Sequence, residues 1–287
     1  MRPLAELQKD FEVAGSLGDI IDVFKMASVI EFRYFATRTK PPQDLPREVA
    51  QALSDVRAEL AARRVVSGVF NLDAALPAVI ILVTPDEGFT GELTPSLVNA
   101  ALEKKSGQQD EILVLGERGV RYLQDQRKNF FAFPGLKDSM DGSEAFKVRD
   151  HFFGDMGTRF GSVWVVYPHF VSLSVQKLTA VSLYPVPPSA LPPPRVRGFA
   201  GELLIEPDPK QATAALAKLW VGCRLLECFW SAKLGEYAAR IMNLESSAQE
   251  LADLKKKFSL EYFKQVHAVR DKSIREITSS KIVGNRK

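Results

Sequence analysis

The chain has 287 residues, of which 46% are apolar and 25% charged, and its 38 basic and 35 acidic residues leave a net charge of +3. These fractions are typical of a folded globular protein, exclude wholesale disorder, and do not indicate nucleic-acid binding. Two cysteines and three histidines are too few for a disulfide framework or a zinc site, and no run approaches the roughly 20 apolar residues that span a bilayer, so we expect membrane contact only through a partner.

The N-terminal region, residues 1–65, is predicted to form a coiled-coil helix and a second helix after it. Apolar residues spaced four, three, four and three apart form a heptad seam of the kind that pairs two helices: Val13, Leu17, Ile20, Phe24 and Ala27. Other apolar residues lie off this seam and predict that the helix is enclosed on more than one side: Ile21, Met26, Ile30 and Phe35. Pro41 and Pro42 end the first helix, and the second is predicted over residues 46–64.

The middle region, residues 75–200, alternates short apolar runs with helical stretches. The apolar runs predict strands over residues 78–84, 111–115, 130–133, 162–167 and 177–184. Helices are predicted over residues 93–105, 119–127 and 143–153. This alternation favours an α/β domain with a mostly parallel sheet. Six prolines between residues 185 and 194 predict an extended crossing on the surface.

The last region, residues 208–287, predicts one very long helix. Asp208 is a suitable N-cap and Pro209 a suitable first helical residue, and no proline follows. The 75 residues from 210 to 284 would span roughly 110 Å as a helix. An apolar seam continues along it through Phe258, Tyr262, Val266 and Val269. We therefore expect the N- and C-terminal helices to pair as an antiparallel coiled coil, with the α/β domain at its base.

Two motifs in the first third of the chain are similar to segments of a known protein family. Residues 20–28 resemble its Ile-Thr-Lys-Ala-Met-x-Met-Val-Ala segment, with Met26 at the second methionine. The segment after the first predicted strand resembles its Ser-x-Asp-Arg-Gly-Leu-Cys-Gly-Gly-Leu signature. Four residues match this signature: Asp86, Gly88, Gly91 and Leu93. Three do not match: Glu87, Phe89 and Thr90.

Four later motifs follow in the family's order. Residues 115–119 resemble its Ile-Gly-x-Lys-Gly stretch, and Glu206 and Asp208 resemble the entry to its C-terminal helix. Glu236 and Arg240 match its Ser-Glu-x-x-Ala-Arg-Met motif. Tyr262 and Lys264 match its Leu-x-Tyr-Asn-Lys stretch. Taken together, the chain resembles the gamma subunit of F-type ATP synthases over nearly its whole length.

One departure from the family lies near the end of the long helix. The family continues with Arg-Gln-x-x-Ile-Thr, and its Arg-Gln pair contacts the surrounding catalytic head. Here these positions hold Val266 and His267, and Ile-Thr becomes Arg270 and Asp271. Glu276 and the following isoleucine remain. The resemblance therefore indicates a divergent or alternative-type member.

The resemblance implies a Rossmann-like α/β domain and a mechanical function. The chain would be the central-stalk rotor shaft that couples proton or sodium translocation by the membrane ring to ATP chemistry in the head. It would itself carry no catalytic, cofactor or metal site. Its partners would be the alpha and beta head subunits, an epsilon-type subunit and the membrane c-ring. It would lie at the cytoplasmic face of the bacterial plasma membrane, or at the equivalent face of an energy-transducing membrane. The candidate head contacts are Lys25, Met26, Val266, His267, Arg270, Asp271 and Glu276.

Two other functions stay open at this point. The lost Arg-Gln pair is compatible with a non-rotating, gamma-like scaffold. The strand–helix alternation and the turn at residues 88–91 are compatible with a stand-alone nucleotide-binding protein, although the Walker Gly-Lys-Ser/Thr is lacking. Glu236 and Arg240 are predicted to form an ordinary intrahelical ion pair. Cys223 and Cys228 are predicted to pack in a core.

Overall fold

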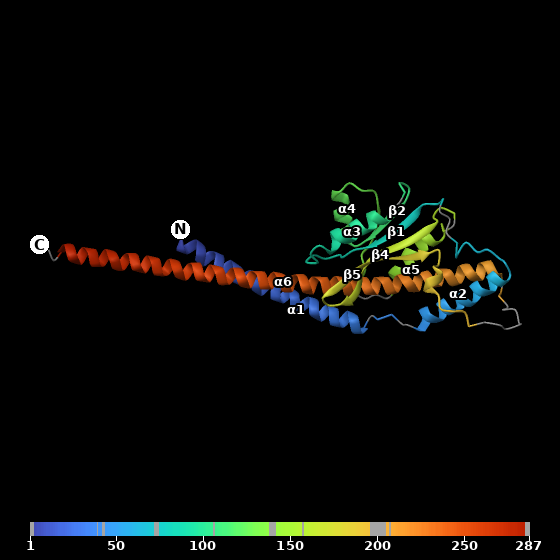
Figure 1. Ribbon diagram of the computed structural model, residues 1–287, viewed down its shortest axis with the longest axis horizontal. Coiled ribbons are helices and arrows are strands. Elements are labelled where there is room, and N and C mark those ends of the chain that lie inside the picture. Colours follow the sequence, from blue (N-terminus) through green and yellow to red (C-terminus); the bar gives the residue numbers. More distant parts are fainter. Residues whose placement is uncertain are drawn as a thin grey trace. The chain divides into compact units, whose positions relative to one another are not determined.

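The computed structural model describes residues 3–38, 40–41, 44–71, 75–105, 107–137, 142–156, 158–195, 205–206 and 208–284. Backbone contacts divide the chain into two units. The helix-pair unit comprises residues 1–29 and 241–287, and the sheet unit comprises residues 30–240. Two helices contribute to both units, namely α1 (Leu4–Arg38) and α6 (Pro209–Gly284), as the labels in Figure 1 allow the reader to follow.

The helix-pair unit consists of α1 and α6 packed antiparallel. Side chains of α6 lie close to two glycines of α1: Leu251 lies 3.7 Å from the position of a Cβ on Gly18, and the Lys255 ammonium lies 3.6 Å from that on Gly15. Further along, the Lys25 ammonium of α1 lies 3.1 Å from the Glu245 carboxylate of α6. Rising residue numbers on one helix meet falling numbers on the other, which confirms the predicted antiparallel pairing.

The predicted seam of α1 is wrong by one residue. Four of its members are 46–51% exposed: Val13, Leu17, Ile20 and Phe24. The packed face of α1 lies one position later, at residues 14, 18, 21, 25 and 28, where Ala14 is 4% and Ser28 3% exposed. Alanine, glycine and serine at positions 14, 18 and 28 let the two backbones approach closely, and Ile21 and Lys25 complete the packed face.

The expectation that α1 is enclosed on more than one side is met only in part. Ile21 is half-buried and Phe35 is 1% exposed, so both lie on the packed side. Met26 and Ile30 are 67% and 62% exposed. Within the described residues, no second element covers that side of α1.

The sheet unit is built on five strands in the order β3-β2-β1-β4-β5. Their bounds are β1 (Ala78–Val83), β2 (Glu111–Leu115), β3 (Phe131–Phe133), β4 (Ser162–Ser172) and β5 (Val175–Tyr184). The first four strands are parallel and β5 is antiparallel to β4, which confirms the mostly parallel sheet. β4 extends five residues beyond the predicted end. The prediction stopped short because exposed and buried side chains mix in the last residues of the strand, so no continuous apolar run marks them.

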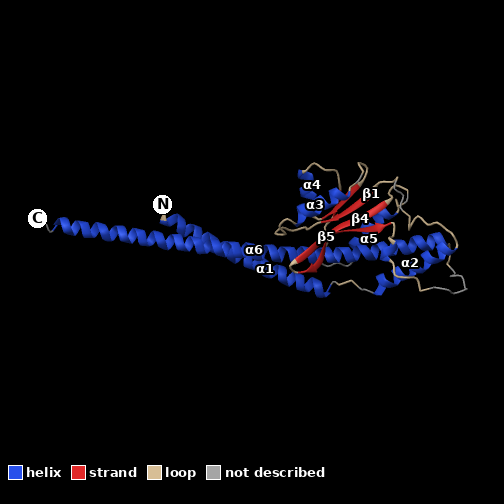
Figure 2. Ribbon diagram, in the orientation of Figure 1, coloured by secondary structure: helices blue, strands red, loops and turns tan. Residues whose placement is uncertain are grey.

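Helices cover both faces of this sheet, as Figure 2 shows by secondary structure. Ile80 and Leu82 point to one face, where they pack with α3 (Leu93–Lys104) and α4 (Glu117–Asp125). Ile81 and Val83 point to the other face, where they share a core with α2 (Asp44–Ala62), α5 (Ser143–Phe153) and the first part of α6. The strand period of two separates the two cores along β1.

The first part of α6 is a core element of the sheet unit. Trp220, Leu225 and Phe229 are at most 2% exposed and belong to the larger core, as does Cys228. The helix begins as predicted, because the Asp208 carboxylate accepts hydrogen bonds from the backbone N–H groups of residues 210 and 211 at 3.0 and 3.1 Å. The proline-rich connector holds a short 3-10 helix, η1 (Pro188–Ala190), which the sequence did not predict.

Candidate functional site

The outer side of α1 in the helix-pair unit is apolar and exposed. It carries the four residues of the wrongly predicted seam together with Val23, which is 68% exposed, and Met26. Several large exposed apolar residues on one helix are typical of a surface where another protein binds. The predicted candidate Met26 therefore lies where a partner can reach it.

Lys25, the neighbouring candidate, lies on the packed side. Its ammonium makes ion pairs at 3.1 Å with Asp22 on α1 and with Glu245 on α6. Hydrogen bonds with Asp22 and Glu245 raise the pKa of Lys25. The structure thus ties Lys25 to the α1–α6 interface, whereas its neighbour Met26 faces outward.

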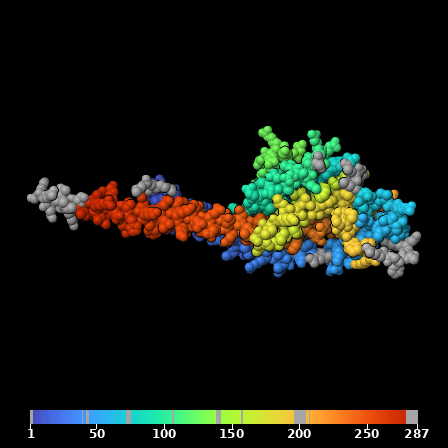
Figure 3. Space-filling view, viewed as in Figure 1, coloured from blue at the N-terminus to red at the C-terminus, as the bar shows by residue number. Residues whose placement is uncertain are grey.

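The remaining candidates lie toward the end of α6. Val266 is half-buried, and four are exposed: His267, Arg270, Asp271 and Glu276. In Figure 3 the red tail of α6 continues beyond the stretch that the blue α1 accompanies. Just before it, Phe11 of α1 and Tyr262 and Phe263 of α6 line a groove of about 290 Å³. Lys264, a family-motif residue, is exposed.

The signature segment forms the loop between β1 and α3 in the sheet unit. Gly91 has φ +56°, a conformation that favours glycine, and Leu93 begins α3 and packs on the smaller core. The Asp86 carboxylate accepts a hydrogen bond from the Glu117 N–H at 3.1 Å, at the positive start of α4. The loop is thereby bonded to the next loop of the sheet.

The end of β1 is fastened to the motif at residues 115–119. The Thr84 hydroxyl donates to the Leu115 carbonyl at 2.8 Å and accepts from the Gly119 N–H at 3.1 Å. Gly116 has φ +102°, and a Cβ there would lie 2.1 Å from the Thr84 carbonyl oxygen. Only glycine fits where these two chain segments cross, so the glycines of the motif are explained by their packing against Thr84.

Glu236 and Arg240 form a buried network and not an ordinary pair on a helix surface, which corrects the prediction. Arg240 lies 2.7 Å from Glu236 and 3.1 Å from Glu87, and its Nε–H donates to the Gly88 carbonyl at 3.2 Å. Lys233 lies 3.3 Å from the other oxygen of Glu236. Burial raises the pKa of Glu236, against the opposing effect of Lys233 and Arg240.

The network connects three elements because Arg240 also reaches α1. Its Nη1 lies 3.6 Å from the Glu31 carboxylate, and its own side chain is only 5% exposed. A guanidinium presents five N–H donors in a rigid fork, which suits it to bind several acceptors at once. One side chain of α6 therefore bonds to both the signature loop and α1 inside the sheet unit.

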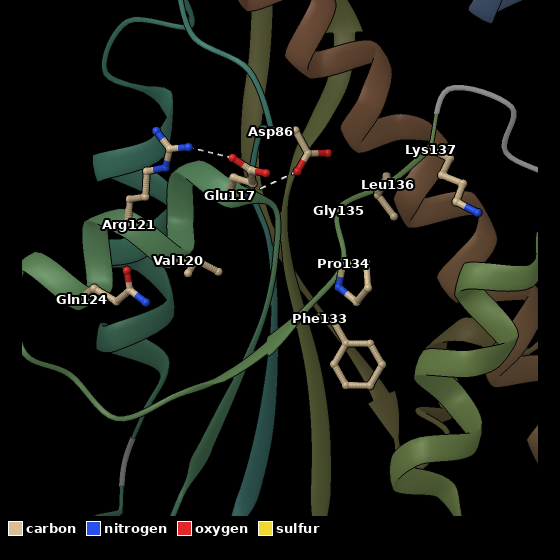
Figure 4. Close-up of a pocket in the computed structure, with 10 residues that line it drawn as sticks. All are labelled: Asp86, Glu117, Val120, Arg121, Gln124, Phe133, Pro134, Gly135, Leu136 and Lys137. Carbon is tan, nitrogen blue, oxygen red and sulfur yellow. Dashed lines mark hydrogen bonds and ion pairs between the residues drawn. The ribbon is translucent and has the colours of Figure 1, made fainter.

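A pocket of about 520 Å³ lies beside α4 at the carboxyl ends of β1 to β3, as Figure 4 shows. Its charged lining is of mixed sign: Asp86 and Glu117 face it, and so do Arg121 and Lys137. Glu117 and Arg121 neutralise each other at 2.9 Å. Within the described ranges, no group of three or more His, Cys, Asp or Glu side chains is placed to hold a metal ion.

In doubly wound sheets, ligands bind outside the carboxyl ends of the strands where the strand order reverses. Here that point lies between β1 and β4, and α6 fills it. A Cβ on Gly235 of α6 would lie 2.7 Å from the Pro168 carbonyl oxygen of β4, and Arg240 bonds to the loop after β1. This arrangement argues against the nucleotide-binding alternative, because the chain's own helix occupies the crevice.

Comparison with known proteins agrees with the motif resemblance. The protein-family model described as ATP synthase matches residues 3–281. Two relatives named ATP synthase gamma chain, from Roseiflexus sp. (strain RS-1) and Roseiflexus castenholzii, are 25% and 26% identical to this chain. The alignments cover 96% of this chain and 96% of each relative. The chain belongs to the ATP synthase gamma family.

Solved structures share the fold of this gamma-family chain. One is a rotor of the Euglena gracilis mitochondrial ATP synthase, with a TM-score of 0.64 and 18% identity over 93% of this chain and 98% of the other. Another, titled OSCP/F1/c-ring of the same enzyme, has a TM-score of 0.69 and 17% identity over 98% and 94%. A Tetrahymena thermophila central stalk/c-ring chain has a TM-score of 0.62 and 14% identity over 80% and 99%.

In this gamma-family member the structure brings together residues from two separate motifs. Gly88 of the signature segment and Arg240 of the later motif lie in hydrogen-bond contact. Glu206 is exposed. Lys233 and Glu87 also join the network but were not predicted as site residues. Glu87 was noted only as a mismatch to the signature, and a single sequence gives no signal for its bond to α6.

The described helices of the gamma-family chain give no sign of a membrane span, since none has an apolar stretch long enough to cross a bilayer.

Proposed function

We propose that this chain is the central-stalk rotor subunit of an F-type ATP synthase. It couples ion translocation through a membrane c-ring to ATP synthesis or hydrolysis in a head of alpha and beta subunits. The observation that carries the proposal is the exposed apolar side of α1, on an antiparallel helix pair of a gamma-family chain. An epsilon-type subunit and the c-ring are the partners proposed for the sheet unit.

The mechanism is mechanical and rests on the unequal sides of the helix pair. One side presents large apolar residues such as Leu17 and Phe24, and another presents charges such as Lys255 and Glu245. Each orientation of such a rod offers a different surface to the subunits around it and so favours a different conformation of them. Rotation then changes the catalytic sites in turn, while nucleotide chemistry stays with the beta subunits.

We propose that the chain itself is not catalytic. This is supported by α6, which fills the crevice where a doubly wound sheet would bind a nucleotide. We propose that the complex lies at the cytoplasmic face of the bacterial plasma membrane, or at the equivalent face of another energy-transducing membrane, with the chain attached through its partners.

Among the candidate head contacts, Met26 is a direct one because it is 67% exposed beside the apolar side of α1. Lys25 acts indirectly by bonding α1 to α6. The exposed tail of α6 offers His267, Arg270, Asp271 and Glu276. Val266 is half-buried and takes the place of the family's polar residue. Contacts between this part of α6 and the head are therefore weaker and less directional than in the family pattern.

The test is purification of the complex from native membranes through a tag on this chain. We expect alpha- and beta-type ATPase subunits to co-purify, and Ile20→Glu together with Met26→Glu to reduce their yield severalfold. Phe131→Glu on β3 is the matched control, because Phe131 is 52% exposed and lies in the sheet unit. A partner-free chain from membranes that contain the intact ATPase would contradict the proposal.

Rotation separates this proposal from the scaffold alternative, which the replacement of the Arg-Gln pair by Val266 and His267 favours. A single-molecule assay on the purified head and this chain measures whether ATP turns it. ATP-driven turning supports the rotor, and a complex that hydrolyses ATP while this chain stays still supports the scaffold.

A further inference from the structure

A rotor needs its shaft helix to keep one rotational setting in the sheet unit. The first part of α6 is held there mainly by apolar residues such as Trp220, Leu225 and Phe229. Apolar burial is non-directional, so it holds the helix in the core more firmly than it fixes its angle about its own axis. Hydrogen bonds and ion pairs from α6 to the strands are directional and fix that angle.

The first directional contact joins α6 to the end of β4. The Ser231 hydroxyl accepts a hydrogen bond from the Phe170 N–H at 3.0 Å and lies 3.0 Å from the His169 Nδ1. One turn later, Gly235 lies directly against the Pro168 carbonyl. Ser231 is 7% exposed, so water competes little for these bonds.

The second directional contact joins α6 to the loop after β1 and to α1. Arg240 bonds to the Gly88 carbonyl and to the Glu87 carboxylate in that loop, and to Glu31 on α1. Its partner Glu236 is held on the same helix at 2.7 Å. Arg240 and Glu236 are both buried, so the bond between them is stronger than its counterpart on a surface, whereas Glu87 and Glu31 are 71% and 49% exposed.

The two contacts lie on opposite sides of the helix. Arg240 follows Ser231 by nine positions, which at 3.6 residues per turn places the two roughly 180° apart around the axis of α6. One contact holds the last part of β4 and the other holds the loop after β1, and these two strands are neighbours in the sheet. Bonds on opposite sides of an axis act as a couple, so turning α6 in either direction strains both.

We infer that Ser231 and Arg240 form a rotational lock, through which torque passes between the shaft helix and the sheet unit. The inference rests on the proposed rotor function, and Arg240 is a positioning residue in it. Without the lock, α6 can rotate about its own axis relative to the strands of the sheet unit. Fewer ions are then transported for each ATP hydrolysed.

The first test uses the full chain alone and measures amide hydrogen exchange. Arg240→Met removes the bonds to the loop, and Ser231→Ala removes the acceptor of the Phe170 N–H. We expect exchange of the amides of residues 86–90 in the first variant, and of Phe170 in the second, to rise by about tenfold or more. Arg224→Met is the matched control, since the ion pair of Arg224 with Glu227 stays within α6.

The second test uses the assembled complex and measures ion uptake per ATP hydrolysed. We expect Arg240→Met to lower this ratio at least twofold and Arg224→Met to leave it unchanged. Glu87→Gln is a milder variant in case Arg240→Met does not fold, because Glu87 is 71% exposed and loses only one bond of the lock. A ratio that stays at the wild-type value while exchange of the loop rises would overturn the torque role.

The two tests fail separately. If the wild-type chain does not assemble with a head, the proposed function is wrong, and the exchange measurements still decide whether Arg240 and Ser231 hold α6. If the wild-type complex pumps ions and neither variant changes exchange at residues 86–90 or 170, the lock does not exist.

Discussion

Cys228 gives a quantitative prediction about stability at alkaline pH. It lies on α6 with 1% of its surface exposed, and burial raises the pKa of its thiol from 9.0 to about 11. The thiol is therefore neutral in the folded chain at pH values where it is ionised in the unfolded chain. Above pH 9 the unfolded state binds fewer protons than the folded state, so stability falls as pH rises.

The size of the loss follows from the shift. Two pKa units correspond to about 2.7 kcal/mol at pH values above 11, and about half of this, ~1.4 kcal/mol, is lost by pH 10. Burial also raises the pKa of Tyr167, which interacts with Cys228. Ionisation of Tyr167 in the unfolded chain adds to the loss above pH 10 in any variant that retains the tyrosine.

The assay is urea unfolding followed by tryptophan fluorescence at pH 8 and pH 10 with a reductant. Cys228→Ala removes the titrating group, so we expect the stability difference between wild type and variant to shrink by about 1.4 kcal/mol from pH 8 to pH 10. Val221→Ala, at another fully buried position of α6, is the control whose difference stays constant. A wild-type-to-Cys228→Ala difference that does not change with pH would refute the reasoning.

Three further substitutions test the local structure. Gly116→Ala is expected to lower the free energy of unfolding in urea by about 2 kcal/mol or more, because Gly116 has a positive φ and contacts Thr84. Gly154→Ala is the control: a Cβ there meets nothing within 4 Å, so we expect a change in stability of less than about 0.5 kcal/mol. Asp208→Ala removes the N-cap of α6 and is expected to cost about 1 kcal/mol and to speed amide exchange in its first turn; unchanged exchange there would contradict the capping role. Glu245→Gln removes the ion pair between Glu245 of α6 and Lys25 of α1. We expect a loss of less than about 1 kcal/mol in the free energy of unfolding, and a smaller loss at high salt. A larger loss that does not depend on salt would show that solvent does not screen this ion pair.

The elements of the fold were predictable because their signals are local. The apolar run at residues 78–84 predicted β1, the helix at residues 143–153 was predicted with its observed bounds, and Asp208 with Pro209 located the start of α6. Hydrophobic periodicity, β-branching and helix capping act over a few residues, so a single sequence contains them.

The register of the helix pair was not predictable in the same way. Large apolar residues of α1 predicted the seam at Val13 and Leu17, but the structure packs Ala14 and Gly18 against α6. The rule that apolar residues face the partner helix fails where the helix also presents a surface to other proteins. The apolar residues of that second surface repeat along the helix as a seam does, so the sequence pattern does not show which of the two sides packs against α6.

Local patterns along the chain were enough to predict the α-helices and strands, the mostly parallel sheet and the family that the motifs resemble. The packed side of α1 and the bonds of Arg240 to Glu87, Gly88 and Glu31 became known from the folded chain alone. Local geometry depends on neighbours along the chain, whereas a buried ion network depends on which distant segments the sheet brings together. Gly88 and Arg240 are 152 positions apart in the chain, and no local pattern signals their contact, which forms because the loop after β1 meets α6.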